Sequence, residues 1–146
     1  MKLKLTRPWL LTTAIAAVSA GILSGIPSTM WALTTDGDPW EATVAAGAIV
    51  LGREASFGAL LVVATVVHGG MSCFWAGVLC AFLPARRTVF WGVFADGLIA
   101  LLDILVIGRF IPTIRALAFL PQLADHLMFG AVVGASIRFR HRGKAR

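Results

Sequence analysis

The segment Gln122–Ala135, QLADHLMFGAVVGA, is almost entirely apolar, yet an acid, Asp125, and a base, His126, stand side by side within it. In water such a pair is unremarkable. In a bilayer, each ionisable side chain costs a few kcal/mol to insert, so such residues tend to be functional or to hold helices together. The meaning of the pair therefore depends on the solvent around this segment.

The composition of the chain indicates that this solvent is lipid. Of the 146 residues, 58% are hydrophobic and 14% are charged, and the mean hydropathy is +0.85. A soluble domain carries about 25% charged residues, and a chain this apolar would have too little polar surface to stay dispersed in water. We therefore expect residues 1–146 to form a single integral membrane domain.

Four stretches of the chain are long enough and apolar enough to cross a bilayer core, which requires about 20 residues in a helix. They predict an all-α membrane protein, a bundle of four transmembrane helices at residues 9–33, 57–83, 89–107 and 119–137. Pro27 is expected to bend the first helix just after Gly25. The short connection at residues 84–88 predicts that the second and third helices are antiparallel neighbours.

The net charge of +6 is better explained by membrane topology than by nucleic-acid binding. With four spans, the basic residues divide ten against three between the two sides, which is the positive-inside pattern and predicts both termini in the cytoplasm. The basic tail 138–146 can also touch anionic lipid headgroups, at about 1 kcal/mol per residue. The ten are Lys2, Lys4, Arg7, Arg86, Arg87, Arg138, Arg140, Arg142, Lys144 and Arg146; the three are Arg53, Arg109 and Arg115.

The two outer loops, 34–56 and 108–118, are expected to contain short interfacial helices. Asp38-Pro39-Trp40-Glu41 is typical of a helix start, with Asp38 as the cap, and the helix should end near Gly52. About a dozen residues are too few to span the bilayer. The second loop is semi-apolar and is interrupted by Pro112.

The N-terminus has a second interpretation. Its basic start and the sequence Val18-Ser19-Ala20 resemble a signal peptide, whose cleavage would leave three spans and a chain beginning at Gly21. The apolar run continues to Leu33, which favours an uncleaved helix.

Small residues recur every four positions on three of the predicted helices. Such ridges let helix backbones approach closely where lipid supplies no hydrophobic drive for association. We therefore predict helix packing at Gly21 and Gly25 on the first helix, Gly69 and Gly77 on the second, and Gly130 and Gly134 on the fourth.

Six polar side chains inside the predicted spans form the candidate site. Asp96 and Asp103 are seven residues apart and share one helix face, and His126 shares a face with Gly130 and Gly134. We expect His126 to contact the second or third helix, with His68, Ser72 or Asp103 as its partner. Asp125 should find a different partner, such as Arg115 or a backbone amide. The set is His68, Ser72, Asp96, Asp103, Asp125 and His126, with Arg109 and Arg115 as charge partners of Asp103 on the outer side.

Several functions remain open for this set. It can handle protons, ions or small solutes, or it can lock the helices of an accessory or structural subunit together. His68 and His126 could instead be axial ligands of a haem, and together with Asp103 and Asp125 they could bind a divalent metal. Cys73 and Cys80 suit buried small residues better than a disulfide. No phosphate-binding loop, Gly-x-Ser-x-Gly elbow or metalloprotease signature occurs, so an enzyme is not favoured.

Residues 65 to 142 resemble the YagU-like family of small bacterial inner-membrane proteins. The similarity rests on His68 with Ser72 and Phe74, a Gly-rich third helix, the loop containing Pro112, and His126-Leu127 with Phe129-Gly130 before a basic end. The resemblance implies a location in the bacterial inner membrane and carries no catalytic residues with it. A homo-oligomer or a larger membrane complex would be compatible with such a chain.

Overall fold

The structure, a computed structural model, describes residues 7–143, and every regular element in that range is a helix. One of these elements is a very short 3-10 turn, Ile107–Arg109. The helices are α1 (Arg7–Leu23), α2 (Ile26–Thr34), α3 (Glu41–Leu51), α4 (Phe57–Phe82), α5 (Thr88–Leu105), α6 (Pro112–Arg115) and α7 (Phe119–Gly143).

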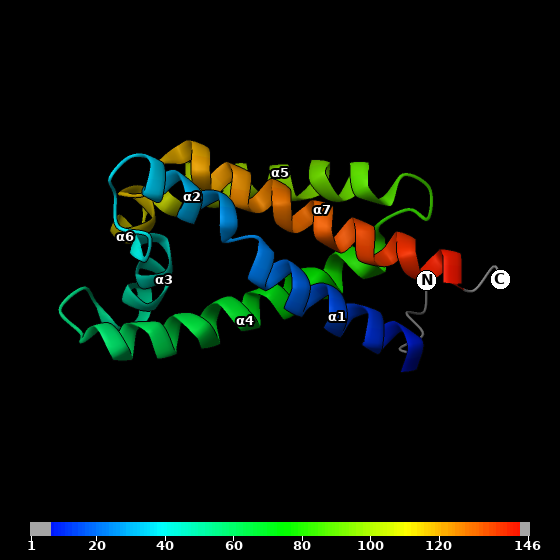
Figure 1. Cartoon of the computed structure of the whole chain (residues 1–146), viewed down its shortest axis with the longest axis horizontal. Coiled ribbons are helices and arrows are strands. Elements are labelled where there is room, and N and C mark those ends of the chain that lie inside the picture. The colour runs from blue at the N-terminus through cyan, green and yellow to red at the C-terminus, as the bar shows by residue number, and fades with distance from the viewer. Residues whose placement is uncertain (1–6, 144–146) are drawn as a thin grey trace.

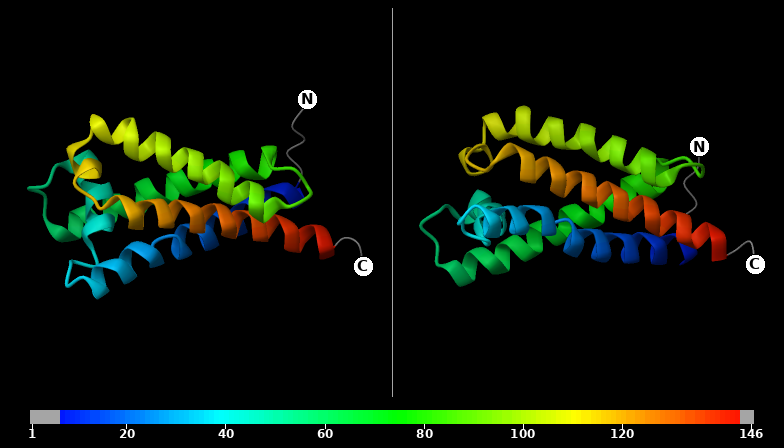
Figure 2. Two further views of the ribbon diagram at one scale, coloured as in Figure 1. Left: turned by 90° about the horizontal axis from the view of Figure 1, so that it is seen from above. Right: turned by 45° about the horizontal axis from the view of Figure 1, so that its top comes forward.

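The long helices run along the long axis of the molecule, and the short helices α3 and α6 gather at one end of it (Figure 1). α1 and α2 together make one broken rod that runs beside α7. The start of α1 and the end of α7 lie at the opposite end from α3 and α6 (Figure 2). Successive long segments therefore alternate in direction.

Three helical stretches are long and apolar enough to cross a membrane: Trp9–Thr34, Phe57–Phe82 and Thr88–Arg109. The molecule is built accordingly, with small residues inside and large apolar residues outside. Ala16, Ala20 and Ala76 are fully buried, whereas Ile22, Val66 and Phe74 are among many large side chains left exposed. Lipid tolerates such a surface, and close packing of small residues is how helices associate within it. The chain is therefore an all-α protein with membrane-spanning character.

α7 is 25 residues long but is not among the three apolar stretches. Its first half contains Gln122, Asp125 and His126, and the helix continues through Arg138 and Arg140, six residues beyond the end predicted at 137. It nevertheless contacts α1, α2, α4 and α5, so it lies at the centre of the helix packing.

The prediction that the second and third spans are neighbours is wrong. α5 packs chiefly against α7, and α1 is the main long-helix neighbour of α4. The connection between α4 and α5 is short, but Arg87 adopts a left-handed backbone conformation with φ 57°, and the two helices diverge from this turn (Figure 1). A tight connection does not force two helices together when a third helix offers a better packing face.

The seam between α5 and α7 is a contact between backbones. A Cβ added at Gly134 would lie 2.5 Å from the carbonyl oxygen of Thr88, and one added at Gly130 would overlap the Gly92 backbone. Gly130 and Gly134 thus pack as predicted. Gly92 was not predicted to be a packing residue, although the same four-residue spacing occurs on α5. Its buried face consists of Thr88, Gly92, Asp96 and Ala100.

The other predicted packing glycines divide into two groups. A Cβ at Gly21 would lie 2.9 Å from the Ser72 hydroxyl, and one at Gly77 would make an ordinary 3.8 Å contact with Thr13. Gly25 and Gly69 have nothing within 4 Å of an added Cβ, so the packing prediction fails for both. Gly25 lies in the break between α1 and α2, and Gly69 faces a cavity described below.

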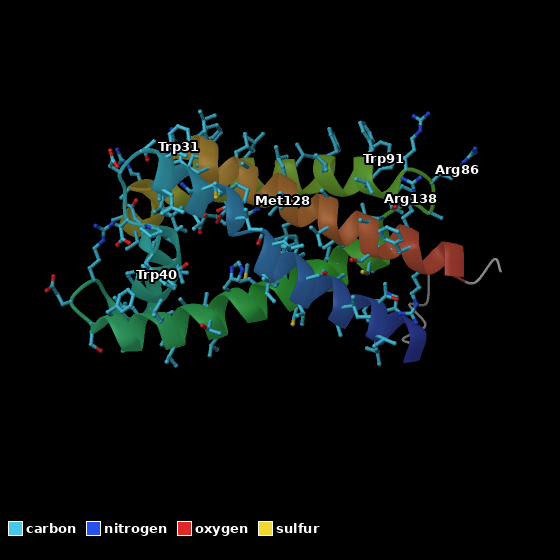
Figure 3. All side chains as sticks on the ribbon, in the orientation of Figure 1. Trp31, Trp40, Arg86, Trp91, Met128 and Arg138 are labelled. Atoms are coloured by element: carbon cyan, nitrogen blue, oxygen red, sulfur yellow. The ribbon has the colours of Figure 1, made fainter. Side chains whose placement is uncertain are left out.

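Aromatic and basic side chains mark the two ends of the molecule. Arg86 and Arg138 lie at one end with Trp91 close by, while Trp31 and Trp40 lie toward the other (Figure 3). At that second end Trp40 packs edge-on against Phe57, with ring centroids 6.0 Å apart. The prediction of Asp38 as the helix cap is wrong, because the N-cap of α3 is Trp40 and the Asp38 carboxylate accepts from the Trp40 amide instead. The helix ends at Leu51, next to Gly52 as predicted.

Candidate functional site

The first long segment is interrupted in its middle, and the interruption exposes backbone polar groups. α1 ends at Leu23 and α2 begins at Ile26, with Pro27 in its first turn. Proline has no N–H and its ring clashes with the carbonyl four residues earlier, so the helix cannot continue unbroken. Carbonyls at the end of α1 and amides at the start of α2 then need other partners.

His68 on α4 binds the open end of α1. Its Nε2 lies 2.8 Å from the carbonyl oxygen of Gly21, and since a carbonyl only accepts, Nε2 must donate. Ser72, one turn after His68 on α4, packs against Gly21 and is buried. His68 itself is exposed, so the expectation that an ionisable side chain within a span would be buried in the bundle is wrong for this residue.

Asp125 on α7 binds the open start of α2. The Ser28 amide donates to Asp125 Oδ1 at 2.9 Å, which realises the predicted contact with a backbone amide rather than with Arg115. A carboxylate at a helix N-terminus is favoured by the partial positive charge of the free amides. The break is therefore held from both sides by ionisable side chains, His68 on one end and Asp125 on the other.

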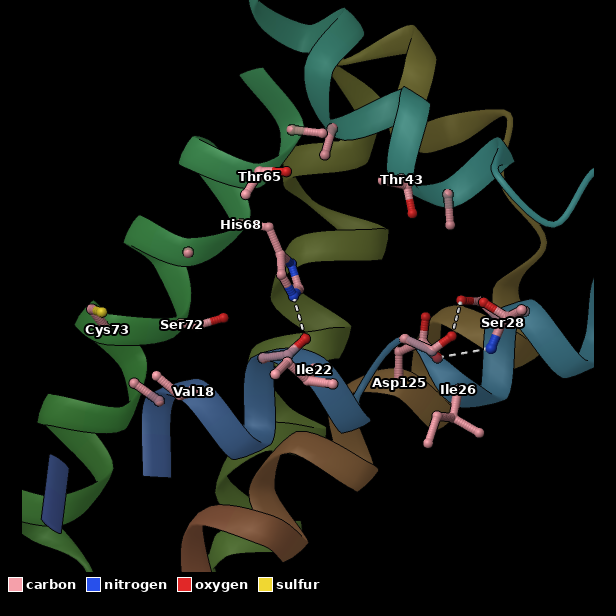
Figure 4. Close-up of a pocket in the computed structure, with 18 of the residues that line it drawn as sticks. Val18, Ile22, Ile26, Ser28, Thr43, Thr65, His68, Ser72, Cys73 and Asp125 are labelled. Atoms are coloured by element: carbon pink, nitrogen blue, oxygen red, sulfur yellow. Dashed lines mark hydrogen bonds between the residues drawn. The ribbon is translucent and has the colours of Figure 1, made fainter. Parts of the chain in front are cut away.

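The same two side chains line a cavity of about 700 Å³. It is bounded by α1, α2, α3 and α4, with Asp125 entering from α7. Figure 4 shows His68 reaching toward the end of α1 and Asp125 bonded to Ser28 at the start of α2. A volume of this size holds a small organic molecule.

His126 faces the other way, toward α5, and lies between two carboxylates. Its Nδ1 is 3.8 Å from Asp96 Oδ2 and its Nε2 is 3.6 Å from Asp103 Oδ2. Both separations are ion-pair distances and are too long for hydrogen bonds. Of the three partners predicted for His126, Asp103 is the one that lies beside it, and Asp96, which was not predicted as a partner, completes an acid–imidazole–acid triad.

The two carboxylates of this triad differ in their access to the surface. The Asp96 side chain is 2% exposed and its Oδ2 has no hydrogen bond among the residues described, whereas the Asp103 side chain is 33% exposed. Asp96 is deep because it sits on the small-residue face of α5, against Gly130. The triad thus leads from a partly exposed acid, through an imidazole, to a buried acid.

Arg109 and Arg115 are not the charge partners of Asp103 that the sequence predicted. Within residues 7–143 neither forms an ion pair, and His126 rather than an arginine lies beside Asp103. Arg109 belongs to the short 3-10 turn after α5 and Arg115 ends α6, and both side chains are exposed. The chain turns away from α5 at this point, which takes the guanidinium groups with it.

The haem and metal hypotheses gain no support from the geometry. His68 uses Nε2 on a backbone carbonyl in the cavity, while His126 faces α5. Across residues 7–143 no three His, Cys, Asp or Glu side chains are placed to share one ion, so His68, Asp103, Asp125 and His126 do not form a single metal site. Cys73 and Cys80 are free thiols; Cys73 is exposed, contrary to the expectation of burial.

Comparison with known protein families, with curated proteins and with solved structures finds no match to this chain. Within residues 7–143, the fold and the site define an all-helical protein with three apolar helical stretches of membrane length, an interruption in the first of them, and a set of His and Asp side chains between its helices.

Proposed function

We propose that the chain crosses a bacterial inner membrane four times, with α7 as the fourth span and both termini in the cytoplasm. Support comes from the alternating direction of the long segments, which leaves Arg86 and Arg138 at the same end (Figure 3). Basic residues favour the cytoplasmic side. A polar α7 is compatible with a span because its ionisable groups face α5 and α2 rather than lipid.

Reporter fusions test this topology directly. Fusions at Gly37 and Thr113 should report the outer side, and fusions at Ala85 and Arg146 the cytoplasm. Gly37 lies in the connection between α2 and α3, Thr113 lies in the short helix α6, and Ala85 lies in the turn between α4 and α5. A cytoplasmic signal from Gly37 combined with an outer signal from Ala85 would reverse the proposed orientation.

The function supported best is the handling of protons, ions or a proton-coupled small solute at the break in the first span. The observation that carries this proposal is the interrupted helix whose two open ends are bound by His68 and Asp125 at the wall of a cavity. Interrupted membrane helices place backbone charges at mid-membrane and are a recurring way to build solute sites in transporters.

The triad supplies a route for protons beside that cavity. An imidazole can accept a proton on one ring nitrogen and release one from the other. His126 presents Nε2 to the partly exposed Asp103 and Nδ1 to the buried Asp96, and it is the chain neighbour of Asp125. We therefore assign proton transfer to Asp103, His126, Asp96 and Asp125. Asp125, which lines the cavity, also makes the contact with the solute or ion.

Proton flux into liposomes tests the function. Purified protein would be reconstituted with an internal pH-sensitive dye, and a potassium diffusion potential would drive protons inward. Wild-type protein should acidify the lumen faster than protein-free liposomes, and Asp125→Asn should reduce the protein-dependent rate at least about tenfold because it removes a proton-transferring group. Asparagine keeps the acceptor oxygen for the Ser28 amide, so folding should be preserved.

Glu54→Gln is the matched control for this assay. Glu54 is exposed in the connection between α3 and α4, outside the cavity, so the same loss of one carboxylate should leave the flux unchanged. Equal fluxes through wild type and Asp125→Asn would contradict the proposed function.

A structural lock is the second candidate, and one observation favours it. Asp96 is buried directly at the glycine contact between α5 and α7, where an added Cβ at Gly130 would lie 2.8 Å from the Asp96 Cβ. An ionisable side chain at such a contact can specify how two helices pair. The lock predicts the same contacts as a proton relay through His126, and combining His126→Leu with Asp96→Asn separates the two.

A further inference from the structure

The lining of the cavity at the helix break indicates the charge of what it can hold. Among the described residues that line it, Asp125 is the one carboxylate, and there is no lysine or arginine. The other group that could become positive is His68, which already donates Nε2 to the Gly21 carbonyl. The ionised cavity therefore repels anions and favours a positive charge.

The remaining lining is largely apolar, with few free hydroxyls. The Ser28 hydroxyl donates to the Gly25 carbonyl at the helix break, and the Thr65 hydroxyl donates to the Leu61 carbonyl of its own helix. Ser72 is only 5% exposed, and its hydroxyl has no hydrogen-bond partner among the described residues, so it remains available inside the cavity. Figure 4 shows Ser72 and Thr43 directed into the space that also receives His68.

The position of the cavity indicates how its occupant arrives. It is bounded by residues from the middle of two membrane-length helical stretches, Trp9–Thr34 and Phe57–Phe82. Val18, His68 and Cys73, on its rim, are exposed on the side of the molecule. A molecule reaching the site from this side must pass through the apolar part of the bilayer, which selects a lipophilic one.

We propose that this cavity binds a lipophilic organic cation of drug-like size, with the Asp125 carboxylate as its counter-ion. The proposal deepens the proposed function and rests on its assignment of Asp125 to solute contact. The volume of about 700 Å³ suits such a molecule. Asp125 Oδ1 accepts from the Ser28 amide, and the negative charge that both carboxylate oxygens share compensates the cation.

Two ions of the same shape and opposite charge test the proposal. Equilibrium binding of tetraphenylphosphonium and of tetraphenylborate would be measured on the full chain in detergent. The cation should bind saturably, at least about tenfold more tightly than the anion, because a single desolvated charge pair contributes that much. Equal affinity for the two ions would overturn the proposal, since it would mean that the cavity selects shape alone.

Two variants test whether the Asp125 carboxylate is the counter-ion of the bound cation. Asp125→Asn should weaken binding of the cation at least about tenfold, and Glu54→Gln, which removes a carboxylate outside the cavity, should leave it unchanged. Circular dichroism and gel filtration would confirm that both variants fold. Unchanged cation binding by folded Asp125→Asn would refute the role of Asp125.

Cys73 provides an independent measure of location, because it is exposed and lines the cavity. In a Cys80→Ala background, bound tetraphenylphosphonium should slow alkylation of Cys73 by N-ethylmaleimide, and tetraphenylborate should not. Protection by neither ion would show that the cation binds elsewhere and would overturn the proposal. Cation binding without proton flux in liposomes would instead refute the proposed function alone, and proton flux without cation binding would refute this inference alone.

Discussion

Gly130→Ala should lower the stability of the protein in detergent by about 2 kcal/mol or more, because a single methyl group there has no space. The added carbon would overlap the Gly92 carbonyl oxygen and lie 2.7 Å from its carbonyl carbon. Real Cβ atoms do not approach backbone so closely, and a backbone cannot rotate out of the way as a side chain can. α5 and α7 would have to separate along their whole seam.

Gly69→Ala is the matched control. Gly69 lies in the middle of α4, and an alanine Cβ there would have nothing within 4 Å. Alanine within a helix is favoured over glycine by about 0.5–1 kcal/mol, so this variant should unfold at the same temperature as wild type or higher. Thermal unfolding followed by tryptophan fluorescence would compare the two. Equal unfolding temperatures for both variants would show that the α5–α7 contact is not as close as described.

This seam also shows how far sequence reasoning reaches. The four-residue spacing of small residues correctly marked Gly130 and Gly134 on α7. The same spacing on α5, through Thr88, Gly92 and Ala100, carried the same information and was overlooked. Spacing cannot say which ridge meets which, because that choice depends on the shapes of all the helices together. The wrong pairing of α4 with α5 has a different origin, because it rested on the short connection between them, and a short connection does not force two helices to pack.

The break in the first segment was foreseeable, but its partners were not. Proline at position 27 removes a donor and obstructs a carbonyl whatever surrounds it, so a bend near Gly25 follows from local chemistry. The groups that bind its open ends are distant in sequence. His68 bonds to the carbonyl of Gly21, 47 residues away, and Asp125 accepts from the amide of Ser28, 97 residues away. Local rules indicate that such groups need partners but leave the choice of partner to the packing.

The charge partners of the polar set illustrate the same limit. Arg109 and Arg115 follow Asp103 closely in sequence and were natural candidates, yet the 3-10 turn after α5 carries the chain away. His126 takes their place because α7 packs along α5 with its glycine face, and His126 shares that face with Gly130 and Gly134. Helical periodicity therefore predicted which side of α7 His126 occupies. Proximity in sequence, by contrast, predicted the wrong partners for Asp103.

His126→Leu should have the second large effect, a loss of about 3 kcal/mol of stability together with loss of proton flux. Leucine removes the imidazole, whose Nδ1 lies 3.8 Å from Asp96 Oδ2. The Asp96 side chain, which is only 2% exposed, is then left without its charge partner. Asp103 loses the same partner but is one-third exposed, so water compensates it in part. Asp96 therefore accounts for most of the cost.

Adding Asp96→Asn to His126→Leu separates a lock from a relay. Asparagine has nearly the shape of aspartate and carries no charge, so the double variant should recover most of the unfolding temperature lost by His126→Leu. If the triad only locks α5 to α7, the proton flux should return together with the stability. If His126 transfers protons, the double variant should be stable and still fail to acidify the liposomes, because no titratable group remains between Asp103 and the deep end of the seam. We expect the second result, since the His126 ring presents one nitrogen to a partly exposed acid and the other to a buried one. A lock requires only one of these two contacts.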